Sequence, residues 1–159
     1  MFLEDSSDNV NELRRVFAWW ASILILEMMI LTWCTGRLRV KYKIIHSPED
    51  RMWIEEPNAI LHPDGNGHPE IRRIRTVHFD DLKIIMPFLL LIFVWYETSP
   101  NYLIASYVIR GFAICKILDT IFRMKIIDVP SIISVSTHII CHCILFYICV
   151  DTCWYYLVK

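Results

Sequence analysis

Hydrophobic residues occur in four long runs along the chain, separated by polar segments. The runs lie at about residues 16–33, 82–96, 102–122 and 132–158. A helix needs about 20 mostly apolar residues to cross the hydrocarbon core of a bilayer. The first and last runs meet that requirement on their own, whereas the second and third contain charged residues that must face protein or lie near an interface. The pattern predicts four membrane-spanning helices.

The polar segments between the runs contain residues that favour turns and helix ends. Gly36 is expected to end the first helix, because glycine tolerates the left-handed conformation of a helix stop. Four prolines and two glycines between residues 47 and 69 exclude a long helix there. Residues 99–101 predict a tight turn, and Asp128 followed by Pro130 predicts the cap and first turn of the fourth helix.

We therefore expect one all-α domain, residues 1–159, folded as an integral-membrane four-helix up-and-down bundle. The expected spans lie at about residues 12–35, 73–98, 101–124 and 130–157, with a cytosolic loop at 36–72.

Composition supports the membrane interpretation. Hydrophobic residues make up 55% of the chain, above the usual share of about 45–50%, and the mean hydropathy is +0.41. A net charge of -1 and the absence of nucleotide-binding and zinc-knuckle motifs give no indication of a nucleic-acid partner. The acidic residues Glu4, Asp5 and Asp8 argue against a cleaved signal peptide, so we expect the first span to persist.

Lysine and arginine are distributed unevenly between the connecting segments. Eight lie between residues 36 and 75 and two in the segment after the third run, whereas residues 97–101 contain none. Because basic loops stay on the cytoplasmic side of a membrane, we expect both basic segments in the cytosol and both termini in the lumen.

Several ionisable residues fall inside the predicted spans, where each needs a partner. Glu27 is expected to pair with Lys83 of the neighbouring span, and Lys116 and Asp119 lie one helical turn apart and could extend the network. Two interpretations remain open: the charges hold the helices together, or they polarise a ligand.

Arginines gather around the start of the second span, at positions 39, 72, 73 and 75. A guanidinium group matches carboxylate and phosphate groups, so this cluster could bind a small anion. The alternative is that these residues only set topology and contact lipid headgroups.

His138 and His142 lie at i and i+4 in the fourth span, a spacing that could serve a haem or a metal ion. The sequence gives no obvious set of further ligands for them, and polar contacts between helices explain them more simply. We predict no metal site.

Three stretches of the sequence resemble the membrane-associated proteins in eicosanoid and glutathione metabolism, a family that includes microsomal glutathione transferase and microsomal prostaglandin E synthase. They are residues 35–39 leading to Ser47-Pro48-Glu49-Asp50, residues 73–88, and Ser99-Pro100-Asn101. The resemblance extends over roughly residues 16–155. It implies a four-helix subunit in a homotrimer, with glutathione bound between subunits near the cytosolic face.

The resemblance also implies which residues form the site. Residues expected to bind glutathione are Arg39, Arg73, His78, Asp81, Lys116 and Thr120. Residues expected to serve the chemistry are Arg123, Ser131 and Asp50.

This chain departs from the family pattern at several positions. Thr76 and Lys83 stand where the pattern has an arginine and a glutamate, and Asp80 replaces its asparagine. Ile132 and Ile133 stand where it has an arginine and, in the prostaglandin synthase, a serine. A thiol titrates near 8.5, and lowering its pKa by two units needs about 2.7 kcal/mol of preferential anion stabilisation. Arg123, Ser131 or the dipole of the fourth helix would have to supply it.

The function implied is a membrane-bound glutathione transferase in the endoplasmic reticulum or the mitochondrial outer membrane. Its partners would be glutathione, lipophilic electrophiles or hydroperoxides, the lipid bilayer and further copies of the chain. The alternatives are a catalytically silent scaffold or lipid-binding protein, and a prostaglandin E synthase-like isomerase. The isomerase is less favoured because its serine position is Ile133.

Overall fold

The computed structural model describes residues 2–45, 60–62 and 67–158. It contains the helices α1 (Phe2–Tyr42), α2 (Pro69–Tyr96), α3 (Tyr102–Arg123) and α4 (Ser131–Val158). Two short strands, β1 (Ile44–Ile45) and β2 (Ile60–Leu61), pair in parallel beside the end of α1. The predicted all-α, four-helix architecture is confirmed.

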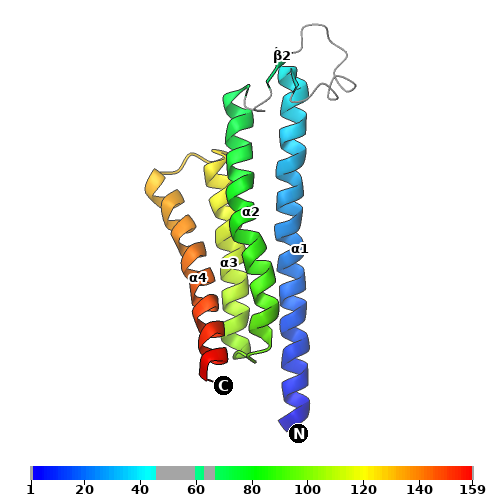
Figure 1. Ribbon diagram of the computed structural model, residues 1–159, viewed down its shortest axis with the longest axis vertical. Coiled ribbons are helices and arrows are strands. Elements are labelled where there is room, and N and C mark those ends of the chain that lie inside the picture. The colour runs from blue at the N-terminus through cyan, green and yellow to red at the C-terminus, as the bar shows by residue number, and fades with distance from the viewer. Residues whose placement is uncertain (1, 46–59, 63–66, 159) are drawn as a thin grey trace.

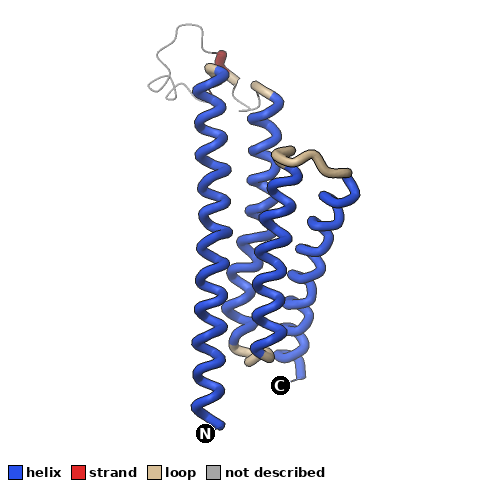
Figure 2. Tube along the Cα trace, turned by 180° about the vertical axis from the view of Figure 1, so that it is seen from behind, coloured by secondary structure: helices blue, strands red, loops and turns tan. Residues whose placement is uncertain are grey.

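The helices form an up-and-down bundle (Figure 1). The α1–α2 and α3–α4 connections lie at one end, and the α2–α3 turn lies at the other, together with the start of α1 and the end of α4. Both α2 and α3 contact α1 and α4, so they occupy the middle of the bundle. Seen from behind, α4 tilts away from the other helices toward its own start (Figure 2). The end with the two connections is called the loop end below, and the other end the turn end.

The core lies along the inward faces of the helices. Apolar residues of α2 recur every three or four positions, as in Ile84, Phe88, Ile92 and Trp95, and all four are buried. The ring of Phe88 stacks on Phe112 of α3 with centroids 3.7 Å apart. This packing fixes α2 against α3 along the middle of the bundle.

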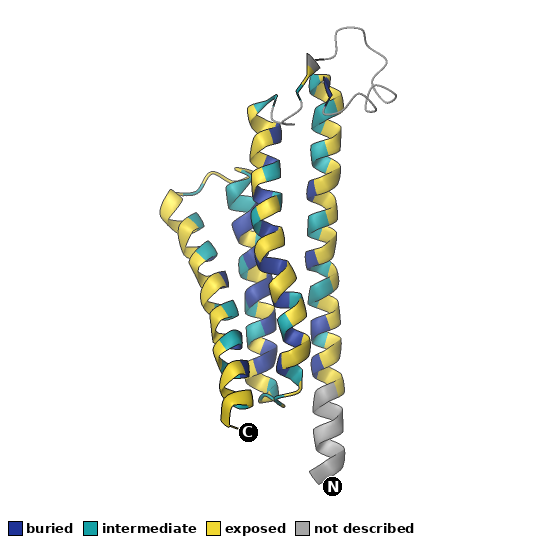
Figure 3. Ribbon diagram, viewed as in Figure 1, coloured by how far each residue is buried: buried dark blue, intermediate teal, exposed yellow. Residues whose placement is uncertain are grey.

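Large apolar side chains cover the outer faces of α1 and α4, and these faces are mostly exposed (Figure 3). The segment Asn11–Tyr42 and the helix Ser131–Val158 are long and apolar enough to cross a bilayer. They correspond to the two runs that the sequence predicts to span on their own. How much of each helix lies in the membrane stays a prediction.

Two predicted helix ends are wrong. α1 continues through Gly36 to Tyr42, and the left-handed residue that follows its end is Lys43, with φ of 56°. Gly36 is tolerated inside the helix because a single glycine costs only about 1 kcal/mol there. α4 begins at Ser131, so Pro130 precedes the helix and Asp128 is not its N-cap.

The second helix begins earlier than the predicted span. His68 caps it by accepting a hydrogen bond from the backbone N–H of Glu70, and Pro69 occupies its first position. Proline is favoured there because its missing N–H would have no helical partner. Residues 36–42 and 69–72, expected in the loop, are therefore helical, and they carry basic side chains on defined helix faces.

Candidate functional site

A cavity of about 380 Å³ opens at the loop end, between the start of α2 and the end of α3. Its α2 residues recur at i, i+3, i+4, i+7 and i+8, so they share one helix face. The described residues that line it are Pro69, Arg72, Arg73, Thr76, Val77 and Arg123. Helix periodicity on α2 places Arg73 on this face, and the end of α3 places Arg123 beside it. The cavity thus brings together two of the predicted site residues.

The charge of this cavity, called the arginine cavity below, is strongly positive. Three of its described lining residues are arginines, and none of the described lining residues is acidic. Arg72 and Arg73 are exposed at the surface of α2, whereas the side chain of Arg123 is only 21% exposed. Guanidinium groups offer paired N–H donors that match a carboxylate. The cavity is therefore suited to a small anion with one or more carboxylates.

Carboxylates of two helices hold Arg123 in place at the cavity wall. Its Nη2 donates a hydrogen bond to Asp80 Oδ2 on α2, and its Nη1 lies 3.9 Å from Asp119 Oδ2 on α3. Nη1 is buried and makes no hydrogen bond within the described residues. The guanidinium is thus held between two carboxylates, and about a fifth of the side chain remains exposed.

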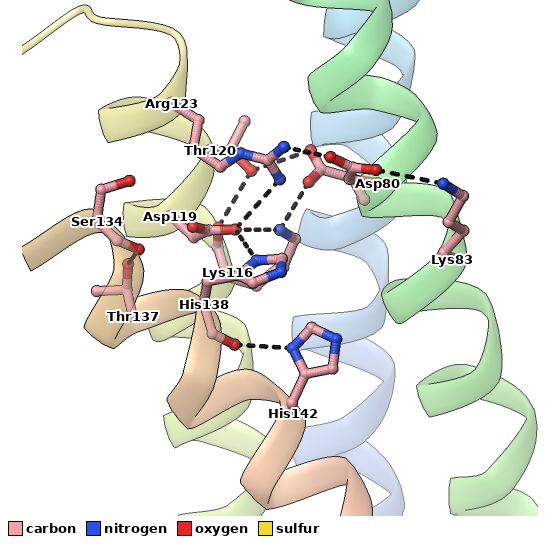
Figure 4. A network of polar contacts seen from close by, with 11 residues as sticks. Asp80, Lys83, Lys116, Asp119, Thr120, Arg123, Ser134, Thr137, His138 and His142 are labelled. Carbon is pink, nitrogen blue, oxygen red and sulfur yellow. Dashed lines mark hydrogen bonds and ion pairs between the residues drawn. The ribbon is translucent and has the colours of Figure 1, made fainter. Parts of the chain in front are cut away.

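Beneath the cavity lies a fully buried ionic cluster formed by Asp81, Lys116, Asp119 and Thr120, called the buried cluster below. Lys116 Nζ lies 2.7 Å from Asp119 Oδ2 and 2.6 Å from Asp81 Oδ1, the latter an ionic contact without hydrogen-bond geometry. Thr120 Oγ1 donates to Asp81 Oδ2 at 3.0 Å. The predicted Lys116–Asp119 contact is confirmed, and part of this network is drawn in Figure 4.

The fourth helix joins this network through His138. Its Nδ1 lies 3.2 Å from Asp119 Oδ2, and His142 Nδ1 lies 2.9 Å from the backbone oxygen of His138 (Figure 4). In the described part of the chain no group of three or more histidine, cysteine, aspartate or glutamate side chains could hold a metal ion. The structure uses His138 as a link between α3 and α4.

The predicted pair of Glu27 and Lys83 is wrong. Lys83 is 71% exposed and binds Asp80, one turn away on its own helix, at 3.4 Å. Glu27 lines an apolar cavity between α1 and α3 beside Thr120, and its two carboxylate oxygens are buried without a hydrogen-bond partner among the described residues. The physical reason is helix rotation: Lys83 lies on the outer face of α2, while Asp81, two residues earlier, faces the core.

The remaining predicted site residues do not line the arginine cavity. Arg39 and His78 are half-buried, and their Nε and Nδ1 atoms make no hydrogen bond within the described part. Ser131 is the exposed first residue of α4. Asp50 lies outside the described residues. In the described part of the chain, therefore, the predicted site residues lie in separate places.

Sequence reasoning missed the main anchor of Arg123. Asp80 stands out in the sequence only as a replacement for the family's asparagine, yet it is the carboxylate that binds Arg123 across 43 positions of chain. The two successive acidic residues Asp80 and Asp81 could have indicated two separate ionic contacts. Adjacent helical positions point about 100° apart, so the two carboxylates reach different partners.

The chain is similar to two kinds of known protein, although no family model matches it. It is 27% identical to microsomal glutathione S-transferase 1 of Rattus norvegicus over 124 residues, which cover 76% of this chain and 77% of that protein. It is 26% identical to prostaglandin E synthase of Homo sapiens over 110 residues, 69% of each chain, and equally to that of Macaca fascicularis.

Both kinds of relative belong to the family that the three sequence stretches resemble. The similarity covers more than two thirds of each chain, and the four-helix fold and two candidate membrane spans agree with it. These findings confirm the predicted resemblance: the chain is an integral membrane protein similar to members of the membrane-associated proteins in eicosanoid and glutathione metabolism.

Proposed function

We propose that the protein is a membrane-bound glutathione transferase in which the glutathione thiolate attacks lipophilic electrophiles or hydroperoxides. The observation that carries this proposal is the cavity shared by Arg72, Arg73 and Arg123. Glutathione carries two carboxylates and a thiol, so it matches a site with several guanidinium groups. The similarity to a microsomal glutathione S-transferase supports the same ligand.

The arginines have two different tasks in this proposal. Arg72 and Arg73, on the exposed face of α2, bind the glutathione carboxylates. Arg123 lies at the opposite wall, where the exposed part of its side chain faces the sulfur. Because Asp80 already binds Nη2, only part of the charge of Arg123 is available to the thiolate.

The buried cluster positions these groups without touching glutathione. Asp81, Lys116 and Asp119 are fully inaccessible to solvent, and Thr120 is 5% exposed. We therefore assign Asp81, Lys116 and Thr120, predicted to bind glutathione, to holding α2 against α3. The cluster fixes the distance between Arg73 and Arg123 across the cavity.

Arg39 and His78 enter the site through assembly of subunits. Each has a buried nitrogen without a hydrogen-bond partner in the described part of the chain, and neither lines the arginine cavity. A homotrimer, which the family resemblance implies, would bring such side chains to a neighbour's cavity. Asp50 and Ser131 are proposed to assist there, Ser131 from the N-terminus of α4, where the helix dipole favours an anion.

The proposed setting is the endoplasmic reticulum or the mitochondrial outer membrane. The loop end, with its basic segments and the arginine cavity, faces the cytosol, where glutathione is available. Both termini lie on the lumenal side. The uneven distribution of lysine and arginine supports this orientation.

A conjugation assay tests the proposal. The full chain is purified in detergent and its turnover of glutathione with 1-chloro-2,4-dinitrobenzene is measured for the wild type, Arg123→Ala and Arg110→Ala. Arg110 is an exposed arginine of the same helix, so it is a matched control. Loss of about 2.7 kcal/mol of thiolate stabilisation predicts about 100-fold lower kcat/KM for Arg123→Ala. The control is expected to remain within twofold of the wild type.

A silent scaffold is the second candidate. Two observations favour it. Asp80 neutralises one side of Arg123. The second and third residues of α4, Ile132 and Ile133, are exposed and apolar, and they stand at the family's arginine and serine positions. Glutathione binding without turnover of any electrophile would support the scaffold and contradict the transferase. Conversion of a prostaglandin endoperoxide by the same preparation would instead support the isomerase chemistry named by the other relatives.

A further inference from the structure

A second cavity, of about 290 Å³, lies at the turn end, far from the arginine cavity. Residues of the α2–α3 turn form one wall, including Pro100, and α4 forms the other. The α4 residues Tyr147, Asp151, Trp154 and Tyr155 all line it. Their spacing of i, i+4, i+7 and i+8 places three aromatic rings and one carboxylate on one helix face. This group is called the aromatic pocket below.

The carboxylate of Asp151 is held in a fixed position. Trp95 Nε1 on α2 donates a hydrogen bond to Asp151 Oδ2 at 2.7 Å, and the ring of Tyr147 meets that of Trp95 edge to face at 6.4 Å between centroids. The acid is therefore oriented by the core through Oδ2, and it is partly exposed where it lines the pocket.

The aromatic pocket carries a negative charge, which favours a cationic ligand. Asp151 is the single charged residue among the described residues that line it. Aromatic rings attract a cation over their faces, and quaternary ammonium groups are bound by such rings together with a carboxylate. Three aromatic rings beside a single carboxylate thus suit a trimethylammonium group.

The place of the pocket identifies the source of that group. Tryptophan and tyrosine gather where a membrane protein crosses the bilayer interface, and the pocket lies at the level of the α2–α3 turn. In the predicted topology this turn joins the second and third spans, so lipid headgroups lie at its level. An interfacial belt explains the aromatic residues, but it does not explain a carboxylate fixed among them by a core tryptophan.

We propose that the aromatic pocket binds the choline headgroup of a bilayer phosphatidylcholine, with Asp151 facing the ammonium charge and Trp154 and Tyr147 covering its methyl groups. The site anchors the end of α4, which is the helix that tilts away at its other end. This proposal is independent of glutathione binding, because the two cavities lie at opposite ends of the bundle.

Native mass spectrometry of the full chain tests the proposal. The protein in detergent is titrated with phosphatidylcholine and with phosphatidylglycerol of identical acyl chains, for the wild type, Asp151→Asn and Trp154→Leu. Asparagine keeps an oxygen for Trp95 while removing the charge. Trp19→Leu is the matched control, because Trp19 is 67% exposed on α1 and Trp154 is 66% exposed on α4.

We expect the wild type to retain phosphatidylcholine at least fivefold more tightly than phosphatidylglycerol. Asp151→Asn should weaken phosphatidylcholine binding about tenfold and Trp154→Leu about threefold, in line with the energy of cation–π contacts. Trp19→Leu should bind as the wild type does. Equal retention of the two lipids, or the same loss in Trp19→Leu as in Trp154→Leu, would overturn the proposal. Displacement of the lipid by micromolar free choline would also overturn it, in favour of a soluble cation.

Discussion

At the scale of single residues, Lys116 has the most demanding environment in the described structure. One ammonium group lies between the carboxylates of Asp81 and Asp119, and all three side chains are inaccessible to solvent. Burial of these charges is costly, and the attraction between them offsets that cost only while every partner is present. Removal of the lysine leaves two buried carboxylates facing each other.

We predict that Lys116→Met lowers the free energy of unfolding by about 3–5 kcal/mol, as expected for breaking a buried pair. Thermal unfolding in detergent, followed by circular dichroism, measures the effect. Lys83→Met is the matched control, since Lys83 is 71% exposed and its pair with Asp80 contributes about 0–1 kcal/mol. Similar losses in the two variants would show that the buried cluster does not stabilise the bundle.

At the scale of helices, Gly36 is the position where the structure differs most from the sequence prediction. The helix passes through it, and no described atom other than its own neighbours lies within 4 Å of the place where a Cβ would stand. Within one subunit, an alanine would fit there without a clash and would favour the helix.

We predict that Gly36→Ala raises the free energy of unfolding by about 0.8–1 kcal/mol, the difference between the two residues inside a helix. Gly111→Ala on α3 is a matched variant, because its surroundings are equally open, and it should show a similar gain. Thermal unfolding of both variants provides the measurement. Destabilisation in Gly36→Ala alone would mean that another subunit packs closely on this face of α1.

The helices themselves could be predicted because their apolar runs are long and their turns contain proline and glycine. The helix end predicted at Gly36 was wrong because a glycine can either end a helix or lie inside it. The packing of α1 on α2 and α3 decides between these two outcomes. Pro130 and Asp128 show the same ambiguity over about three positions at the start of α4.

Contacts between helices could be predicted less well. Lys116 and Asp119 pair within one helix, and their spacing predicts it. The partner of Glu27 depends on how α1 and α2 are rotated about their axes, which no single helix reveals. To predict the arginine cavity, two features had to be known together. Arg72 and Arg73 share one face of α2, and α3 ends at Arg123 beside that face.

At the scale of the whole molecule, the two ends of the bundle differ in chemistry. The loop end carries the arginine cavity, and the turn end carries the aromatic pocket with its single carboxylate. The start of α1 and the end of α4 lie at the turn end (Figure 1). If basic segments remain in the cytosol, the turn end faces the lumen.

We predict that an N-glycosylation acceptor sequence fused before Met1 is modified when the chain is synthesised with endoplasmic reticulum membranes. The same acceptor inserted directly after His62, whose backbone N–H donates a hydrogen bond to Ile45 beside the end of α1, should remain unmodified, because the end of α1 lies at the loop end. A mobility shift on gel electrophoresis that is removed by a glycosidase reports the modification. Modification of the inserted site instead would reverse the proposed orientation.

The central claim is that arginines from α2 and α3 together bind glutathione, and isothermal titration of glutathione into the purified protein tests it most directly. We predict that the wild type binds glutathione and that Arg110→Ala binds it equally well. Arg73→Ala and Arg123→Ala should each bind about tenfold more weakly, as expected for loss of a charge-assisted hydrogen bond of at least about 1.5 kcal/mol. No binding at millimolar glutathione, or equal weakening in Arg110→Ala, would contradict the account.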